Sequence, residues 1–151
     1  MAALRPGRRV LLVGGGVIGM ELASSACELG VHASVIECSP SIMARCAPPL
    51  LRDYLTELHR QRGVAVFLGQ PLVAAQRNAS GDITLTLADG RQLTGDVVVY
   101  GIGVIPDTTL AEQAGLQVAQ GIVIDANSQT SHPDIYAAGD ACSQIDAASG
   151  Q

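Results

Sequence analysis

The chain has 151 residues, 48% of them hydrophobic, and a formal net charge of −5. That length suits one domain of typical size with a substantial core. The acidic balance, with neither a basic stripe nor interleaved aromatic residues, argues against a nucleic-acid partner. No apolar run reaches the roughly 18–20 residues of a membrane span, and no signal-peptide pattern opens the chain. We therefore expect a soluble, cytoplasmic protein with no membrane partner.

The first 37 residues predict a strand–helix–strand unit. Residues 9–13 form a short apolar run, residues 17–29 follow helical periodicity after three glycines, and residues 32–37 are rich in strand formers. A crossover of this kind is right-handed and gives a parallel sheet.

A second helix is expected after a polar, proline-containing loop at 38–49. It spans residues 50–62, with Leu51 and Tyr54 on its apolar face and Arg52 on its polar face. A third strand should follow at 64–68.

The hydrophobic period then changes to two, which indicates antiparallel strands at 72–78, 83–89 and 91–93, joined by Asn, Asp and Gly turn signals. This meander replaces a crossover helix. The remaining expected elements are strands at 96–100, 122–125 and 135–138 and a short helix at 109–114. The predicted fold class is α/β, a Rossmann-like three-layer sandwich whose parallel sheet has an antiparallel β-meander crossover.

A glycine pattern, G-x-G-x-x-G, lies between the first strand and the first helix. Its first glycine allows a tight turn, the second lets a diphosphate approach the backbone, and the third lets helix and strand pack closely. The helix N-terminus then offers N–H groups and a partial positive charge to the phosphates. A plain structural turn is the alternative. The residues assigned to this site are Gly14, Gly15, Gly16, Val17, Ile18 and Gly19.

Glu37 ends the second strand, 23 residues after Gly14, where a carboxylate can accept hydrogen bonds from ribose hydroxyls. Its charge would repel a 2′-phosphate, and the next cation, Arg45, is eight residues further on. This favours NAD(H) over NADP(H). A solvated strand end is the alternative interpretation of Glu37.

Cysteine and histidine spacing predicts no metal site and no Cys-x-x-Cys redox pair. We expect Cys27 to be a small buried hydrophobic residue on the first helix, and the other three cysteines to be ordinary reduced thiols. Those three are Cys38, Cys46 and Cys142.

Three segments, 9–23 (RVLLVGGGVIGMELA), 96–107 (DVVVYGIGVIPD) and 130–142 (TSHPDIYAAGDAC), together resemble the FAD-dependent pyridine nucleotide–disulfide oxidoreductase superfamily in order and spacing. Within it, the chain most resembles the NADH-dependent ferredoxin reductases of dioxygenase and cytochrome P450 systems. The resemblance implies an NAD(H)-binding domain at 8–126 and the truncated start of a second FAD-binding segment at 127–151. The chain would then be a fragment that lacks the first FAD glycine loop.

The resemblance also implies roles for further residues. Glu21 would lie near the nicotinamide carboxamide, although an exposed helix carboxylate is the alternative. The backbone of Gly101, Ile102 and Gly103 would approach the nicotinamide half, unless that segment is a structural turn. Gly139 and Asp140 would contact the FAD ribityl chain. No catalytic acid or base is assigned, because hydride transfer needs positioned cofactors rather than proton transfer by a side chain.

The implied activity belongs to the full-length enzyme: NADH reduces FAD, and electrons pass on to a ferredoxin-type iron–sulfur protein. The fragment alone would be inactive. NADH oxidases, nitrite reductase subunits and rubredoxin reductases share these motifs and stay open as alternatives. A stand-alone NAD(H)-binding module is a further alternative, and so is a homodimer that forms through the strand expected at 135–138.

Overall fold

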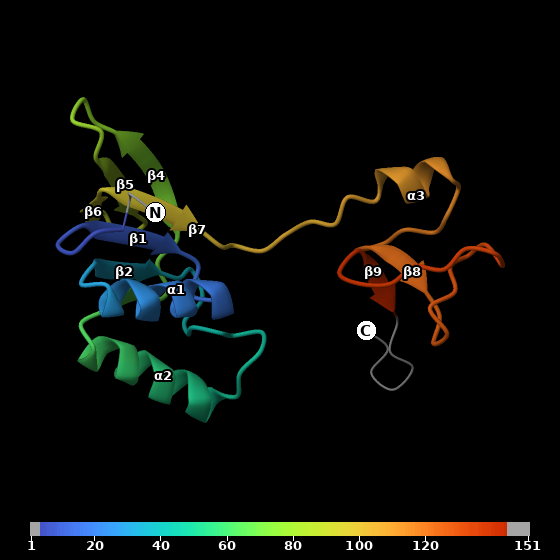
Figure 1. The fold of residues 1–151 in the computed structure, drawn as a ribbon, viewed down its shortest axis with the longest axis horizontal. Coiled ribbons are helices and arrows are strands. Elements are labelled where there is room, and N and C mark those ends of the chain that lie inside the picture. The colour runs from blue at the N-terminus through green and yellow to red at the C-terminus, as the bar shows by residue number, and fades with distance from the viewer. Residues whose placement is uncertain (1–3, 145–151) are drawn as a thin grey trace. The chain divides into compact units, whose positions relative to one another are not determined.

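The computed structural model describes residues 4–144, which divide into two compact units (Figure 1). One unit ends at Ile102 and the other begins at Gly103. Residues 103–126, which we expected to share a domain with the glycine loop, therefore lie in the second unit. The assignment of either cofactor to these segments stays a prediction.

A four-stranded parallel sheet forms the centre of the first unit, with strand order β3-β2-β1-β7. Val13 at the end of β1 is in register with Ile36 of β2 and Tyr100 of β7, so the carboxyl ends of these three strands lie level. The strands are β1 (Arg9–Val13), β2 (His32–Ile36), β3 (Ala65–Phe67) and β7 (Val97–Tyr100).

Two helices cover one face of this sheet, and an antiparallel meander in the order β4-β5-β6 covers the other (Figure 1). The helices are α1 (Val17–Glu28) and α2 (Pro49–Gln61), and the meander strands are β4 (Leu72–Arg77), β5 (Ile83–Leu87) and β6 (Gln92–Gly95). The predicted three-layer fold is confirmed. Most element boundaries differ by one or two residues from those expected, which is ordinary for helix and strand ends.

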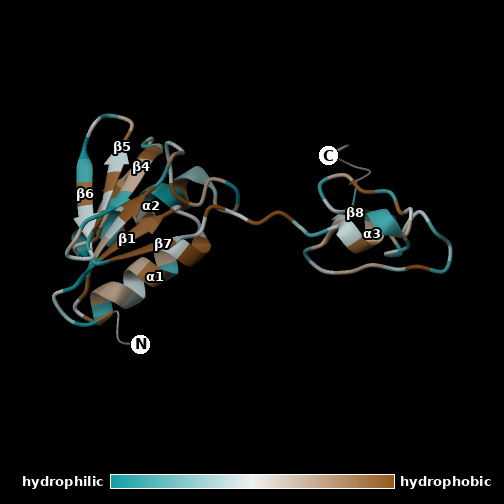
Figure 2. Cartoon of the chain, turned by 90° about the horizontal axis from the view of Figure 1, so that it is seen from above, coloured by the Kyte–Doolittle hydropathy of each residue, from teal (hydrophilic) through white to brown (hydrophobic). Residues whose placement is uncertain are grey.

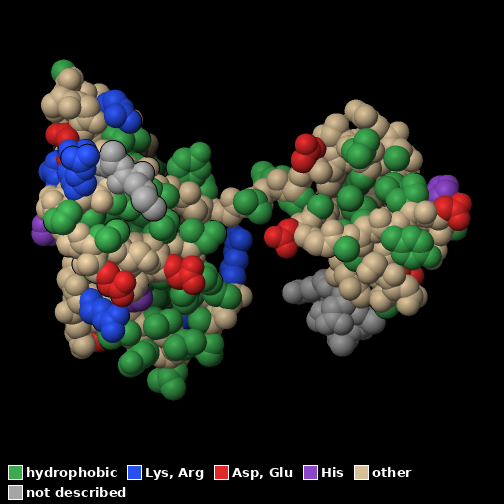
Figure 3. Space-filling model, in the orientation of Figure 1, with side chains coloured by type: hydrophobic (Ala, Val, Ile, Leu, Met, Phe, Trp, Pro, Cys, Tyr) green, Lys and Arg blue, Asp and Glu red, His purple; other side chains and the backbone are tan. Residues whose placement is uncertain are grey.

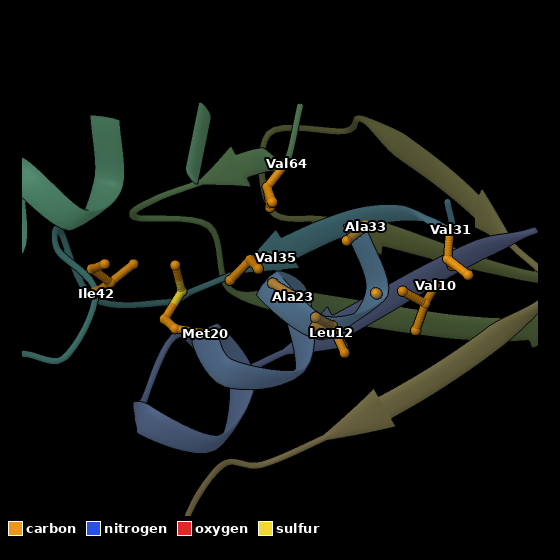
Figure 4. Close-up of a cluster of buried hydrophobic side chains, with 10 residues drawn as sticks. Val10, Leu12, Met20, Ala23, Val31, Ala33, Val35, Ile42 and Val64 are labelled. Atoms are coloured by element: carbon orange, nitrogen blue, oxygen red, sulfur yellow. The ribbon is translucent and has the colours of Figure 1, made fainter. Parts of the chain in front are cut away.

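A hydrophobic cluster fills each of the two interfaces between layers. Met20 and Val35 belong to the helix-side cluster (Figure 4), whereas Leu11 and Leu85 belong to the meander-side cluster. Figure 2 shows β1 and β7 in hydrophobic colours and much of β6 in hydrophilic ones. Full burial of a side chain such as Met20 stabilises the fold by about 1.5–3 kcal/mol, so these two clusters hold the parallel sheet in place.

The expected orientation of α2 is right only in part. Leu55, which shares a face with Leu51 and Tyr54 in the predicted helix, packs against the helix-side cluster. Leu51 and Tyr54 are 43% and 62% exposed, and Figure 3 shows hydrophobic side chains at the surface where α2 lies in Figure 1. The buried position is Thr56, whose hydroxyl donates to the Arg52 carbonyl oxygen at 2.8 Å. The half-buried Arg52 side chain donates to Ala47 O and is therefore held on the inner side of the helix. The buried face of α2 is therefore turned toward Arg52 and Thr56 relative to the face that the leucine periodicity predicted.

The second unit contains α3 (Thr109–Gln113) and a two-stranded parallel sheet of β8 (Ile122–Ile124) and β9 (Cys142–Gln144). The strand expected at 135–138 does not form, and Tyr136 makes only an isolated bridge to Gln129. The backbone of Ile135 is already used, because its carbonyl accepts from Thr130 and its N–H donates to His132 O. The strand on which we based a homodimer is therefore missing from the described residues.

Residues 4–144 contain no helix with both the length and the apolar character that a bilayer crossing would require.

Candidate functional site

The carboxyl edge of the parallel sheet brings three predicted positions together. Gly14, Glu37 and Gly101 directly follow β1, β2 and β7. Backbone hydrogen bonds join the strand ends, since Gly14 N–H donates to Ile36 O and Gly101 N–H donates to Val13 O, both at 2.8 Å. In open α/β sheets, ligands bind at this edge.

Packing requires glycine at two positions of the loop. Gly14 has a φ of +108°, and a Cβ there would overlap the carbonyl group of Gly101. A Cβ on Gly19 would overlap the carbonyl oxygen of Gly14. These two glycines let α1 and β7 approach the loop closely, as expected from the motif.

Gly16 is different, because nothing in the described chain requires a glycine there. Its φ is −74°, and a Cβ would meet no atom within 4 Å. Gly16 is the N-cap of α1, with no side-chain cap and no acidic residue in the first turn. The first N–H groups of a helix have no partner within the helix and carry a partial positive charge. The loop thus leaves open space for an anion in front of free donors.

Val17 and Ile18 begin α1 beside this opening and are 45% and 66% exposed. Glu21 is also exposed, one turn further along the helix. A Cβ on Gly101 would meet no atom within 4 Å, so the backbone there is open to close approach, and Ile102 next to it is exposed. Glu21, Gly101 and Ile102 thus lie in the first unit and are exposed at its surface.

The carboxylate of Glu37 is held by three donors. Its Oε2 accepts from Gly15 N–H at 2.6 Å, and its Oε1 accepts from Ser39 N–H at 2.7 Å and from the Cys38 thiol at 3.4 Å. Partial burial raises the pKa of Glu37, but these hydrogen bonds outweigh burial and hold the pKa below its ordinary value. Glu37 is therefore an ionised, fixed acceptor at neutral pH.

Three predicted FAD- or nicotinamide-contacting residues lie in the second unit. Gly103 and Gly139 have φ values of +108° and +88°, a backbone conformation that favours glycine regardless of any ligand. Asp140 is exposed. Their ligand contacts stay predictions.

The cysteines of residues 4–144 are free thiols in different surroundings. Cys27 packs against the helix-side cluster, where burial raises the pKa of its thiol, while Cys38 and Cys46 are exposed. The described side chains include no group of three His, Cys, Asp or Glu that could hold a metal ion.

Sequence reasoning missed two residues beside the site. Ile42 is fully buried, and Met43 N–H donates to Gly15 O at 2.8 Å. Both belong to the segment expected to be a polar loop. The signal was present, because two adjacent large apolar residues are unusual in an otherwise small and polar loop.

Comparisons with known proteins show what the chain resembles in sequence and in fold. The family model described as pyridine nucleotide-disulphide oxidoreductase matches residues 2–151. The ferredoxin–NAD(+) reductase component of the 3-phenylpropionate/cinnamic acid dioxygenase of Photorhabdus laumondii is 51% identical over 142 residues, which cover 94% of this chain and 36% of that protein. The chain thus spans about a third of the length of this curated relative.

Two solved structures are similar over almost the whole chain. The ferredoxin reductase for the CYP199A2 system of Rhodopseudomonas palustris is 33% identical with a TM-score of 0.89, covering 95% of this chain and 36% of that one. The putidaredoxin reductase in its covalent complex with putidaredoxin is 32% identical with a TM-score of 0.90, covering 98% and 36%.

Proposed function

The chain belongs to the pyridine nucleotide-disulphide oxidoreductase family, and from that premise we propose that its glycine loop and Glu37 bind NAD(H) within a flavoprotein reductase. Membership confirms the resemblance carried by the three sequence motifs. In the whole enzyme, the nicotinamide would supply a hydride to FAD, and the reduced flavin would pass electrons one at a time to a ferredoxin-type iron–sulfur protein. The residues described above supply binding and orientation.

The proposal rests on the pairing of an open anion cradle with a fixed carboxylate. Gly16 leaves space in front of the α1 N-terminus, where a diphosphate would find free N–H donors. Glu37 is hydrogen-bonded to Gly15, the residue just before Gly16. One dinucleotide could therefore place its diphosphate on the loop and its adenosine ribose on Glu37.

Charge at Glu37 favours NADH over NADPH. An ionised carboxylate would repel a 2′-phosphate while it accepts hydrogen bonds from the 2′- and 3′-hydroxyls. The Photorhabdus laumondii relative carries NAD(+) in its name, which supports the same preference.

The other half of the cofactor arrangement is proposed by family analogy. Glu21 and the backbone of Gly101 and Ile102 would meet the nicotinamide half, while Gly103 would continue that approach. Asp140 after Gly139 would meet FAD. A ferredoxin-type partner is supported by the names of the similar reductases, one of which was solved in complex with putidaredoxin.

Calorimetry on the 151-residue chain tests the proposal. Wild-type protein should bind NADH at least tenfold more tightly than NADPH, and Glu37→Gln should weaken NADH about tenfold, as expected for loss of a charged acceptor. The matched control is Glu28→Gln, because Glu28 is an exposed carboxylate at the opposite end of α1. Equal affinity for NADH and NADPH, or an unchanged affinity in Glu37→Gln, would contradict the proposed ribose contact.

A further inference from the structure

Residues 38–48, here called the return loop, leave β2 and come back to the glycine loop before α2 begins. Met43 N–H donates to Gly15 O at 2.8 Å, and Met43 has a φ of +49°, which is uncommon outside glycine. Ile42 is 0% exposed and lies beside Met20 of α1 in the helix-side cluster (Figure 4). The return loop is thus fixed to the core by a buried side chain and a backbone hydrogen bond.

Gly15 contacts both the return loop and Glu37 of the candidate site. A Cβ at Gly15 would lie 3.1 Å from Ile42 Cγ2 and 3.1 Å from Glu37 Cβ, so both side chains occupy the space that a larger residue would need. The N–H of Gly15 donates to Glu37, and its carbonyl accepts from Met43. One peptide segment therefore contacts the return loop on one side and the candidate ribose carboxylate on the other.

Arg52 fixes the return loop from the α2 side. Its Nε donates to Ala47 O at 2.7 Å and its Nη1 donates to Ser41 Oγ at 3.0 Å. These bonds join both halves of the loop to one rigid helix. Ile42 holds the loop near its centre, and Arg52 holds it beside Ile42, at Ser41, and near its C-terminal end, at Ala47.

We propose that the return loop is the positioning element of the dinucleotide site, and that Ile42 holds the Glu37 carboxylate in its ribose-binding place by packing against Gly15. The inference rests on the proposed NAD(H) function. Ile42 and Arg52 are positioning residues that touch no ligand. A buried, closely packed side chain transmits position well because it cannot shift without opening a cavity, and small misplacements of a binding group cost affinity.

A double-mutant cycle tests whether Ile42 acts through Glu37. Ile42→Ala is measured by NADH calorimetry in the native background and in Glu37→Gln. In the native background the loss should be about fivefold or more, a typical coupling for residues that share a partner, and Ile42→Val should recover most of it. In Glu37→Gln, the same Ile42→Ala change should cost less than about twofold. Equal losses in the two backgrounds would overturn the proposal.

Two further variants separate positioning from general loss of stability. Leu85→Ala opens a cavity in the meander-side cluster, where Leu85 is 1% exposed, and should leave NADH affinity unchanged. Arg52→Met keeps the core intact and should weaken NADH only when Glu37 is present. It carries the test if Ile42→Ala does not fold. A loss in Leu85→Ala as large as that in Ile42→Ala would overturn the proposal.

The carboxyl ¹³C titration of Glu37 gives a readout that needs no cofactor. If Ile42 positions the Gly15 donor, the pKa of Glu37 should rise toward its ordinary value in Ile42→Ala and stay low in Leu85→Ala. If wild-type protein fails to bind NADH while the pKa of Glu37 still rises in Ile42→Ala, the NAD(H) function is refuted and the link between Ile42 and Glu37 is kept. Wild-type protein that binds NADH while Ile42→Ala leaves the pKa of Glu37 unchanged would overturn the positioning inference alone.

Discussion

Gly14 and Gly101 meet at the carboxyl edge of the parallel sheet, so closely that a Cβ on Gly14 would overlap the Gly101 carbonyl group. The two residues belong to different sequence motifs and follow β1 and β7, which pair in parallel. The hydrogen bond from Gly101 N–H to Val13 O fixes the same approach. Two motifs far apart in sequence are therefore one packed unit in the fold.

This contact predicts that Gly14→Ala strongly destabilises the first unit. The alanine would combine a φ of +108° with backbone overlap, so we expect a loss of about 3 kcal/mol or more in urea unfolding followed by circular dichroism. Gly81→Ala is the matched control, because Gly81 has a φ of +93° and a Cβ there would meet no atom within 4 Å. That variant should lose only about 1–2 kcal/mol. If both variants lose the same free energy of unfolding, the overlap with the Gly101 carbonyl group does not contribute to the destabilisation.

Gly16→Ala should separate binding from folding. The φ of −74° and the open space around Gly16 accommodate a methyl group, so the free energy of unfolding should fall by no more than about 1 kcal/mol, the cost of alanine at an N-cap. NADH affinity should nevertheless fall at least tenfold, because the methyl would stand where the diphosphate approaches the backbone. Unfolding curves and calorimetry on the same preparation provide the check. Normal NADH binding in this variant would place the diphosphate elsewhere.

The parts of the fold that could be predicted from the sequence are those with local causes. The apolar run of β1 and the glycines after it give the start of α1 at Val17 as expected, and period-two alternation gives the meander. The residues Gly14, Gly16 and Glu37 could likewise be placed on one edge, because consecutive parallel strands end on the same side.

The parts that could not be predicted depend on partners distant in sequence or on backbone competition. The leucine pattern of α2 predicted that Leu51 and Tyr54 are buried and Arg52 is exposed, because no local rule says that Arg52 donates to Ala47 O. Residues 135–138 have strand-forming composition, but the N–H and hydroxyl of Thr130 already donate to Ile135 O, and Ile135 N–H donates to His132 O. The contact between Ile42 and Gly15 is accompanied by a positive φ at Met43, and a methionine in the sequence does not predict that conformation.

The pH dependence of dinucleotide binding should follow the lowered pKa of Glu37. Its folded-state pKa lies below the ordinary value of about 4.3, so the carboxylate is ionised throughout the neutral range. Affinity for NAD⁺, which tolerates acid better than NADH, should be constant from about pH 8 to pH 5 and fall only as the pH drops below about 4. Glu37→Gln should remove that fall, with circular dichroism confirming that both proteins stay folded. A midpoint near neutrality would assign the titration to another group.

Asp96 should stabilise the fold in a pH-dependent way. Its Oδ2 accepts from Arg9 N–H at 2.7 Å, and this bond, aided by the Arg9 side chain and by Arg8, holds the pKa of Asp96 below its ordinary value. A group with a lowered folded-state pKa stabilises the protein above its unfolded pKa of about 3.9, and this contribution disappears as the pH falls through the folded-state pKa. Asp96→Asn should therefore lower the urea midpoint at pH 7, and this deficit should shrink at acid pH as the carboxylate of wild-type Asp96 becomes protonated. Asp53→Asn, which changes an exposed carboxylate of α2, should have little effect at either pH. If the Asp96→Asn deficit is equally large at both pH values, the stabilisation comes from packing and not from the ionised carboxylate.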